Sequence, residues 1–303
     1  MAEQTGHIPF EDEIYWIERT QDVLTNGLMI YNTKDIKSVW EYFKYCLQTQ
    51  NRFFFDHPAI PYIIQQFNNH EWMLSSGTNI YRARIDKTRK HADQCWLARS
   101  YIGLKQMDPN SPFFDAYQEQ AKKIQENKEY QEFQSRYDNG FEGFDAQGSG
   151  APSFDKVAAG RCNPEHVVFL YAANDEHTAT AEVRPYIRDA VSVAVLSVKK
   201  DLRLVDFYYE YDGKGLREID DIFHDVMREE FSTLNKGDKE AYLATQYLSL
   251  LAQHQGFDGI RFRSSLVEKG ANYVIFDPSN CEALSSKMYV IKKVTYDLFP
   301  ILD

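Results

Sequence analysis

The sequence predicts an α+β protein built around a mixed β-sheet. In the C-terminal half, short segments rich in β-branched and aromatic residues alternate with helical segments. Two pairs of consecutive strands are joined by connections too short to hold a helix, which argues against a doubly wound parallel sheet. The N-terminal part, in contrast, has only helical periodicity.

The N-terminal part is predicted to form a helical domain of its own, residues 1–78. Apolar side chains recur at helical spacing from about Phe10 to Asn79, most clearly over residues 38–48 (SVWEYFKYCLQ), where Ser38 is the expected N-cap. A second domain is then expected over residues 79–303. The alternative is a helical extension packed on that second domain.

The second domain begins with residues 80–85 (IYRARI), whose alternating pattern predicts a strand. A polar insertion follows over about residues 105–155. Within it, residues 113–137 predict one helix, and the composition of residues 145–153 (DAQGSGAPS) predicts a flexible loop.

Alternating strands and helices make up the remainder of the chain. The predicted strands are residues 167–173 (VVFLYAA), 191–198 (VSVAVLSV), 202–207 (LRLVDF), 258–264 (DGIRFRS) and 272–277 (NYVIFD). The predicted helices cover about residues 178–184, 216–231 and 239–255.

The composition limits the classes of function. A hydrophobic share of 43% is enough for a sizeable core, and the net charge of −11 argues against a long nucleic-acid footprint, which needs a basic face. The four cysteines are scattered and form no zinc-type spacing, so we expect reduced thiols and no metal site. The N-terminus lacks the pattern of a secretory signal, and no apolar run is long enough to cross a membrane, so we expect a soluble cytoplasmic protein without membrane contact.

Two arginines on the first predicted strand are candidates for anion binding. Arg82 and Arg84 alternate with apolar residues and therefore share one face. A buried guanidinium needs an anionic partner, and its planar fork suits a diphosphate. A structural ion pair with one of the 45 acidic residues is the simpler interpretation of the spacing alone.

A turn and a short helix supply further candidate groups. The segment Gly160-Arg161-Cys162-Asn163 leads into a predicted strand, and its arginine and asparagine could orient a ligand, although an ordinary turn has the same composition. Glu182 follows four small residues, 178–181 (TATA), that allow a helix to approach the sheet closely. A glutamate on a helix is usually solvated, but a carboxylate beside a sugar can stabilise an oxocarbenium-like transition state.

The last candidate lies at the end of a predicted strand. Ser264 precedes Gly270 and Asn272 in a strand, loop, strand segment, where a serine is usually a cap. The sequence contains no GxSxG elbow and no evident serine–histidine relay, which argues against a hydrolase that uses this serine as its nucleophile.

Read together, these segments resemble the RES domain family, from about Tyr81 to Pro278. The resemblance is carried by Tyr81-Arg82, by GRCNP, LYAA and TATAEVR between residues 160 and 184, and by YLATQYLS, GFDGIRFRSS and GANYVIFDP between residues 242 and 278. It implies an ADP-ribosyltransferase-like mixed β-sheet core with flanking helices, and NAD⁺ as substrate, with no further cofactor. It also implies a growth-inhibiting toxin that is neutralised by an antitoxin with a helix-turn-helix domain.

The resemblance also implies a set of site residues. Arg82 and Arg161 match the two arginines of the family, Glu182 and Ser264 match the signature glutamate and serine, and Asn272 and Tyr171 match an asparagine and a pocket tyrosine. The expected catalytic residues are therefore Glu182, Arg82 and Ser264, and the expected substrate-binding residues are Arg161, Asn163, Tyr171 and Asn272. His166 departs from the family pattern, which often has a glycine there, and Phe262 stands where tyrosine is common.

Several functions stay open at this level. The leading hypothesis is an enzyme that cleaves the nicotinamide–ribose bond of NAD⁺, with water or phosphate as acceptor. The alternatives are a mono-ADP-ribosyltransferase that modifies a protein or nucleotide, and a non-catalytic module that binds NAD⁺. For the N-terminal helices, regulation of access, contact with an antitoxin and homo-oligomerisation all stay open.

Overall fold

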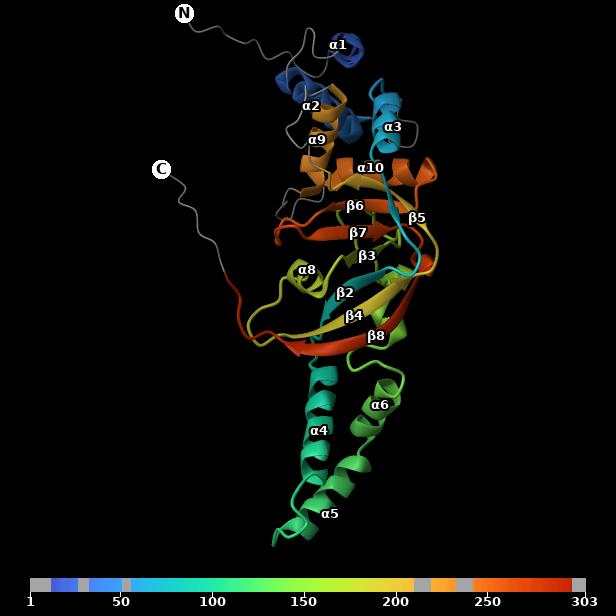
Figure 1. Ribbon diagram of the computed structural model, residues 1–303. Coiled ribbons are helices and arrows are strands. Elements are labelled where there is room, and N and C mark those ends of the chain that lie inside the picture. The colour runs from blue at the N-terminus through green and yellow to red at the C-terminus, as the bar shows by residue number, and fades with distance from the viewer. Residues whose placement is uncertain (1–11, 27–32, 51–55, 210–218, 233–241, 296–303) are drawn as a thin grey trace, which may run out of the picture.

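The computed structural model describes residues 12–26, 33–50, 56–209, 219–232 and 242–295. A curved β-sheet lies at the centre, one group of helices covers one end of it, and a second group projects from the opposite end (Figure 1). The predicted α+β fold with a mixed sheet is confirmed. None of the described helices is long and apolar enough to cross a membrane.

The helices are α1 (Glu13–Asn26), α2 (Thr33–Thr49), α3 (Ile60–Asn69), α4 (Lys90–Lys105), α5 (Phe114–Gln125), α6 (Lys128–Tyr137), α7 (Ala146–Ser149), α8 (Glu176–Glu182), α9 (Ile219–Ser232) and α10 (Leu243–His254). The strands are β1 (Glu71–Leu74), β2 (Asn79–Ile85), β3 (Leu170–Ala173), β4 (Ala190–Val198), β5 (Leu202–Phe207), β6 (Gly259–Arg263), β7 (Ala271–Ile275) and β8 (Cys281–Val290).

Within the described residues, the strands form one sheet in the order β1-β5-β6-β7-β3-β2-β4-β8. Among these described strands, β5 and β6 run parallel and the other neighbours run antiparallel. The short connections β1–β2 and β4–β5 run side by side, since Gly77 and Val198 are hydrogen-bonded there. Each connection joins strands that are not neighbours, so the sheet bends at this corner and encloses a core that includes Leu74, Ile80 and Leu204.

The sheet and the N-terminal helices share a hydrophobic core. One cluster joins Trp40 and Phe43 of α2 to Phe207 of β5 and Phe223 of α9, and β1 pairs with β5. The Trp40 indole N–H also donates a 2.8 Å hydrogen bond to Glu230. The boundary predicted after residue 78 falls between β1 and β2, two strands of this sheet; the division into domains stays a prediction.

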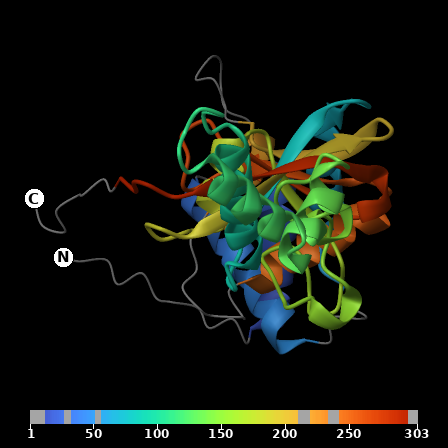
Figure 2. The ribbon, with the colours of Figure 1, turned by 90° about the horizontal axis from the view of Figure 1, so that it is seen from below.

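Helices α4, α5 and α6 form an arm that extends from the edge of the sheet near β8 (Figure 1), and the same helices lie in front of the sheet in Figure 2. The polar insertion predicted over about residues 105–155 contributes α5 and α6 to this arm. The prediction of one helix over residues 113–137 was wrong. The helix stops after α5 and restarts at α6 because Asn127 takes an extended conformation and its side chain accepts a hydrogen bond from the Glu129 N–H, as an N-cap does. Residues 146–149 of the predicted loop form the short helix α7, capped by Asp145.

Several boundaries differ from the prediction. Ser38 lies inside α2, where its hydroxyl donates to the carbonyl of Lys34, so it is not the N-cap. The prediction missed α4 and the two edge strands β1 and β8. The starts of the helices predicted at residues 216 and 239 lie outside the described residues, as does Phe10. All four cysteines are described and unpaired.

Candidate active site

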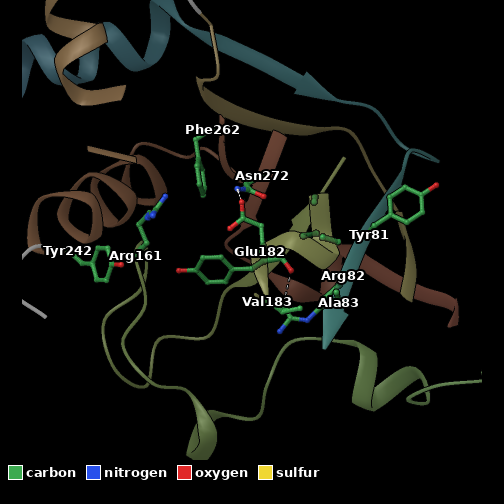
Figure 3. A pocket seen from close by; sticks show the side chains of 13 residues that line it. Tyr81, Arg82, Ala83, Arg161, Glu182, Val183, Tyr242, Phe262 and Asn272 are labelled. Carbon is green, nitrogen blue, oxygen red and sulfur yellow. Dashed lines mark hydrogen bonds between the residues drawn. The ribbon is translucent and has the colours of Figure 1, made fainter. Parts of the chain in front are cut away.

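A cavity of about 380 Å³ opens where the sheet splits. Strands β2 and β3 pair at one position, Tyr81 with Ala173, whereas β2 pairs with β4 along its whole length. Beyond Tyr81 the two strands separate, and side chains from β2, β3, β6, β7, α8 and the loop before β3 line the opening (Figure 3). The candidate residues predicted from distant parts of the sequence meet at this opening.

Helix α8 brings Glu182 to the cavity, because small residues let it lie close to the sheet. Asp175 caps the helix by accepting hydrogen bonds from the backbone N–H and the hydroxyl of Thr178. Thr178 is fully buried against Gly270, where a Cβ atom would lie 2.8 Å from the Thr178 Oγ1 and 3.0 Å from the Ser264 Cβ. Only glycine therefore fits at residue 270 without moving α8 or the β6–β7 hairpin.

The Glu182 carboxylate is fixed through one of its two oxygens. The Ser264 hydroxyl and the Asn272 side-chain amide each donate a 2.7 Å hydrogen bond to Oε1 (the latter is drawn in Figure 3). Ser264 Oγ in turn accepts hydrogen bonds from the backbone N–H groups of Leu266 and Val267, which directs its own proton to the glutamate. Among the described residues none donates a hydrogen bond to Oε2, so this oxygen remains available to a ligand.

Arg82 lies half-buried beside the cavity, and none of the described carboxylates compensates its charge. Its Nη1 donates a 2.6 Å hydrogen bond to the carbonyl of Tyr171, a group that the separation of β2 from β3 leaves without a strand partner. Its Nε is buried with no hydrogen-bond partner, and no acidic side chain of the described residues forms an ion pair with it. Burial, and then repulsion from Arg84, lower the pKa of Arg82 to about 9. Such an environment favours the binding of an anionic ligand, because the anion would compensate the charge of the guanidinium.

The turn at residues 160–163 forms another wall of the cavity. The Tyr171 hydroxyl donates a 2.7 Å hydrogen bond to Asn163 and accepts one from the Cys162 N–H, and burial raises the pKa of Tyr171 well above its usual value. A Cβ atom on Gly160 would lie 2.6 Å from the Asn163 Oδ1, so this close approach requires glycine. Asn163 therefore holds the turn and Tyr171 in place from behind the cavity.

Arg161 lies between two aromatic rings at the cavity wall (Figure 3). Its guanidinium carbon is 5.7 Å from the ring centre of Phe262 and 6.0 Å from that of Tyr242, and its Nη1 donates to the carbonyl of Phe231. The sequence analysis did not assign Tyr242 or Phe262 to the site. The available signals were the departure at Phe262 from the family pattern and the position of Tyr242 at the start of YLATQYLS, one of the segments that carry the resemblance.

His166 stands where the family often has a glycine, and it adopts a backbone conformation that is typical of glycine. Its φ is 66°, in the left-handed region, and its ring stacks on Phe154 with 5.1 Å between the ring centres. This conformation costs a non-glycine residue roughly 1 kcal/mol of free energy, and the stacking on Phe154 offsets part of that cost. The turn before β3 thus keeps a glycine-like path.

The predicted site residues fall into two groups. Those that line the cavity are Arg82, Arg161, Tyr171, Glu182 and Asn272. Ser264 and Asn163 lie behind it and each contacts a lining side chain. Their assignment as catalytic or substrate-binding residues stays a prediction.

A family model and a solved structure match this chain. A family model described as "RES domain" matches residues 133–298, more than half of the chain. The matched range begins after Tyr81 and Arg82, although the structure places both beside the cavity. A chain in the crystal structure of the M. tuberculosis MbcT–MbcA toxin–antitoxin complex is similar at 13% identity and a TM-score of 0.35, over 76% of this chain and 92% of that chain. No curated protein matches the sequence.

Proposed function

Because the chain belongs to the RES domain family, we propose that it consumes NAD⁺ by cleaving the bond between nicotinamide and ribose. The observation that carries the proposal is the arrangement of opposite charges in one cavity. Glu182 offers a carboxylate oxygen that no described residue engages, and Arg82 offers a half-buried cation without a carboxylate partner among the described residues. NAD⁺ presents a positively charged pyridinium at one end and a diphosphate further along, which suits this pair of charges.

In the proposed reaction, Glu182 stabilises the positive charge that develops on the ribose as the bond to nicotinamide breaks. Nicotinamide is cationic in NAD⁺ and leaves as a neutral molecule, so the departure needs no general acid. A fixed carboxylate at this position is worth about 3 kcal/mol of transition-state stabilisation. The two hydrogen bonds to Oε1 hold the carboxylate in place, so that little reorganisation is needed when the charge develops.

The remaining side chains are proposed to orient the dinucleotide. Arg82 and Arg161 would hold the diphosphate; Arg82 is the better-supported contact because it lines the cavity and no described carboxylate forms an ion pair with it. Tyr171 would lie against a ring of the ligand, with its hydroxyl held by Asn163. Asn272 and Ser264 would act mainly through Glu182, which both of them contact.

The test is to incubate the purified chain with labelled NAD⁺, with and without inorganic phosphate, and to identify the products. Free ADP-ribose indicates water as the acceptor, and ADP-ribose 1″-phosphate indicates phosphate. Label on a macromolecule would instead indicate a mono-ADP-ribosyltransferase. Thermal stabilisation by NAD⁺ without any product would contradict the proposed reaction and indicate a binding module.

The biological role that fits this activity is growth inhibition by depletion of NAD⁺, under the control of an antitoxin. This part of the proposal rests on the family resemblance. Expression of the intact chain is expected to lower cellular NAD⁺ and stop growth, and Glu182→Ala is expected to prevent both. Normal NAD⁺ levels during expression of the intact chain would count against a toxin.

A further inference from the structure

The side chain of Arg161 is attached to the end of helix α9. Its Nη1 donates a hydrogen bond to the carbonyl of Phe231, which lies in the last turn of α9. The last carbonyl groups of a helix have no partner within it and carry a partial negative charge, so they attract a guanidinium. Within the described residues of α9, none in this turn is basic, and Arg161 supplies the positive charge instead. The position of this helix end therefore helps to set the position of the Arg161 side chain.

Glu230, the residue before Phe231, connects the same end of α9 to the N-terminal helix α2. Its Oε1 accepts a 2.8 Å hydrogen bond from the Trp40 indole N–H and another of 2.8 Å from the Lys44 Nζ. The two donors are four residues apart and therefore lie on one face of α2. A carboxylate near the C-terminal end of a helix is unfavourable, because this end already carries a partial negative charge. The two donors from α2 offset that cost.

The end of α9 also contacts the aromatic wall of the cavity. Phe231 is fully buried; its ring stacks on that of Phe207 with 4.5 Å between the centres and lies 5.7 Å from that of Phe262. Phe262 in turn is one of the two rings beside the Arg161 guanidinium. Because a packed interior has little free space, a displacement of α9 would move both the carbonyl that holds Arg161 and the ring beside it.

We propose that Glu230 is a positioning residue through which α2 fixes the end of α9, and thereby the Arg161 guanidinium, at the cavity wall. This inference rests on the proposed function, in which Arg161 binds the substrate. It extends that function to a part of the chain outside the residues that match the RES domain. The N-terminal helix α2 then supports the substrate site from a distance, since no described side chain of α2 lines the cavity.

The first measurement needs no ligand. Phenylglyoxal modifies accessible arginine side chains, and peptide mass spectrometry of the full-length chain gives the rate at each arginine. Glu230→Ala is expected to raise the rate at Arg161 about threefold or more, because the helix end that holds this side chain is loosened. The exposed Arg99 of α4 is the internal reference and should react at an unchanged rate. Glu229→Ala is the matched control, because it removes the neighbouring carboxylate, whose ion pair with Lys37 of α2 is exposed.

NAD⁺ consumption by the same variants gives a second measurement. Glu230→Ala is expected to raise the KM for NAD⁺ about tenfold with little change in kcat, as the loss of a charge-assisted contact with the substrate implies. Glu230→Gln keeps an acceptor for both donors of α2 and should retain most of the wild-type KM. In an Arg161→Ala background, Glu230→Ala should cause no further rise in KM, because the group that it positions is already absent.

The possible results separate this inference from the proposed function. If Glu230→Ala folds and leaves the modification rate of Arg161 unchanged, the contact with α2 is only structural and the inference is overturned, whether or not NAD⁺ is consumed. If the rate rises but the wild type does not consume NAD⁺, Glu230 positions Arg161 and the proposed reaction fails.

Two kinetic results would also overturn the inference: an unchanged KM despite the faster modification, or a rise in KM that persists in full in the Arg161→Ala background. Should Glu230→Ala fail to fold, Trp40→Phe and Lys44→Met each remove one donor to the carboxylate. Both are expected to show the same changes to a smaller extent, and the absence of any change in both folded variants would refute the positioning role.

Discussion

Asn272 and Glu182 are joined by a 2.7 Å hydrogen bond between the Asn272 side-chain amide and the Glu182 Oε1, across 90 residues of sequence. The bond connects β7 to the last residue of α8, and Ser264 contacts the same oxygen from the end of β6. Two donors on Oε1 fix the plane of the carboxylate and leave Oε2 for the cavity. This arrangement makes the glutamate the most informative residue to change.

Glu182→Gln is expected to lower the rate of NAD⁺ consumption by about 100-fold or more, because the amide cannot stabilise a developing positive charge. The fold should survive, since the amide oxygen can still accept the hydrogen bonds from Ser264 and Asn272. Product formation and thermal melting would be measured on the same preparation. Glu176→Gln, on the exposed side of the same helix, is the matched control and should keep wild-type activity. An active Glu182→Gln enzyme would remove this carboxylate from the reaction.

Ser264→Ala is expected to lower kcat about tenfold with little change in KM. The substitution removes one donor to Glu182 and leaves the backbone N–H groups of Leu266 and Val267 without their acceptor, so a loss of about 1–2 kcal/mol in the free energy of unfolding should accompany it. The neighbouring Ser265 is exposed, and Ser265→Ala should change neither quantity. A large rise in KM at constant kcat would show that Ser264 contacts substrate instead of positioning Glu182.

The strands with strong alternation could be predicted from sequence, and the edges of the sheet could not. Residues 190–198 are apolar or small because both faces of β4 are largely covered, and in residues 202–207 the polar Arg203 and Asp206 occupy the partly exposed positions between buried apolar residues. In β8 the sequence CEALSSKMYV mixes polar and apolar residues and only one of them is buried, since the strand lies at an edge; β1 is only four residues long. The helix of residues 113–137 looked continuous because periodicity alone does not reveal the cap at Asn127.

At the site, the sequence indicated the charged groups but not the opening that unites them. The separation of β2 from β3 depends on long-range pairing, and no local pattern encodes it. Because of the same separation, Arg82 is a half-buried cation that lines the cavity, although its place on β2 would otherwise make it an ordinary strand residue. Tyr242 illustrates the limit most clearly, because it belongs to the site only through the position of α10 relative to the turn at Arg161.

Gly270→Ala tests whether the close contact between α8 and the β6–β7 hairpin is required. The added methyl group would lie 2.8 Å from the Thr178 Oγ1, so α8 must shift and Glu182 with it. We expect a loss of about 1–3 kcal/mol in stability and a marked fall in activity. Gly270→Ala combined with Thr178→Ala should recover part of both, because the second change makes room for the methyl group.

The control for that experiment is Gly103→Ala in α4. A Cβ atom at residue 103 would meet nothing within 4 Å, so this variant should gain up to about 1 kcal/mol in stability and keep its activity. A Gly270→Ala protein with wild-type activity and stability would mean that α8 tolerates displacement, and that the small residues before Glu182 do not set its position.

We expect the protein to lose stability in mild acid because of His224. Its side chain is buried, its ring stacks on that of His70 with 3.7 Å between the centres, and its Nε2–H donates to the carbonyl of Asp206. Burial, and then the charge of His70, lower the pKa of His224 from 6.5 to about 3. The unfolded chain therefore takes up a proton below about pH 6.5 that the folded chain does not. The stabilisation is complete above that pH and is lost progressively as the pH falls towards 3.

At pH 5 the loss from His224 alone amounts to about 2 kcal/mol. His57, whose pKa burial lowers to about 4, adds to it. Urea unfolding at pH 7.5 and pH 5 would measure the effect, and His224→Gln, which keeps a donor for Asp206 but cannot be protonated, should reduce the acid loss by roughly that amount. His254→Gln alters an exposed histidine at the end of α10 and should leave the acid loss unchanged. Equal acid sensitivity of the wild type and His224→Gln would show that other groups determine it.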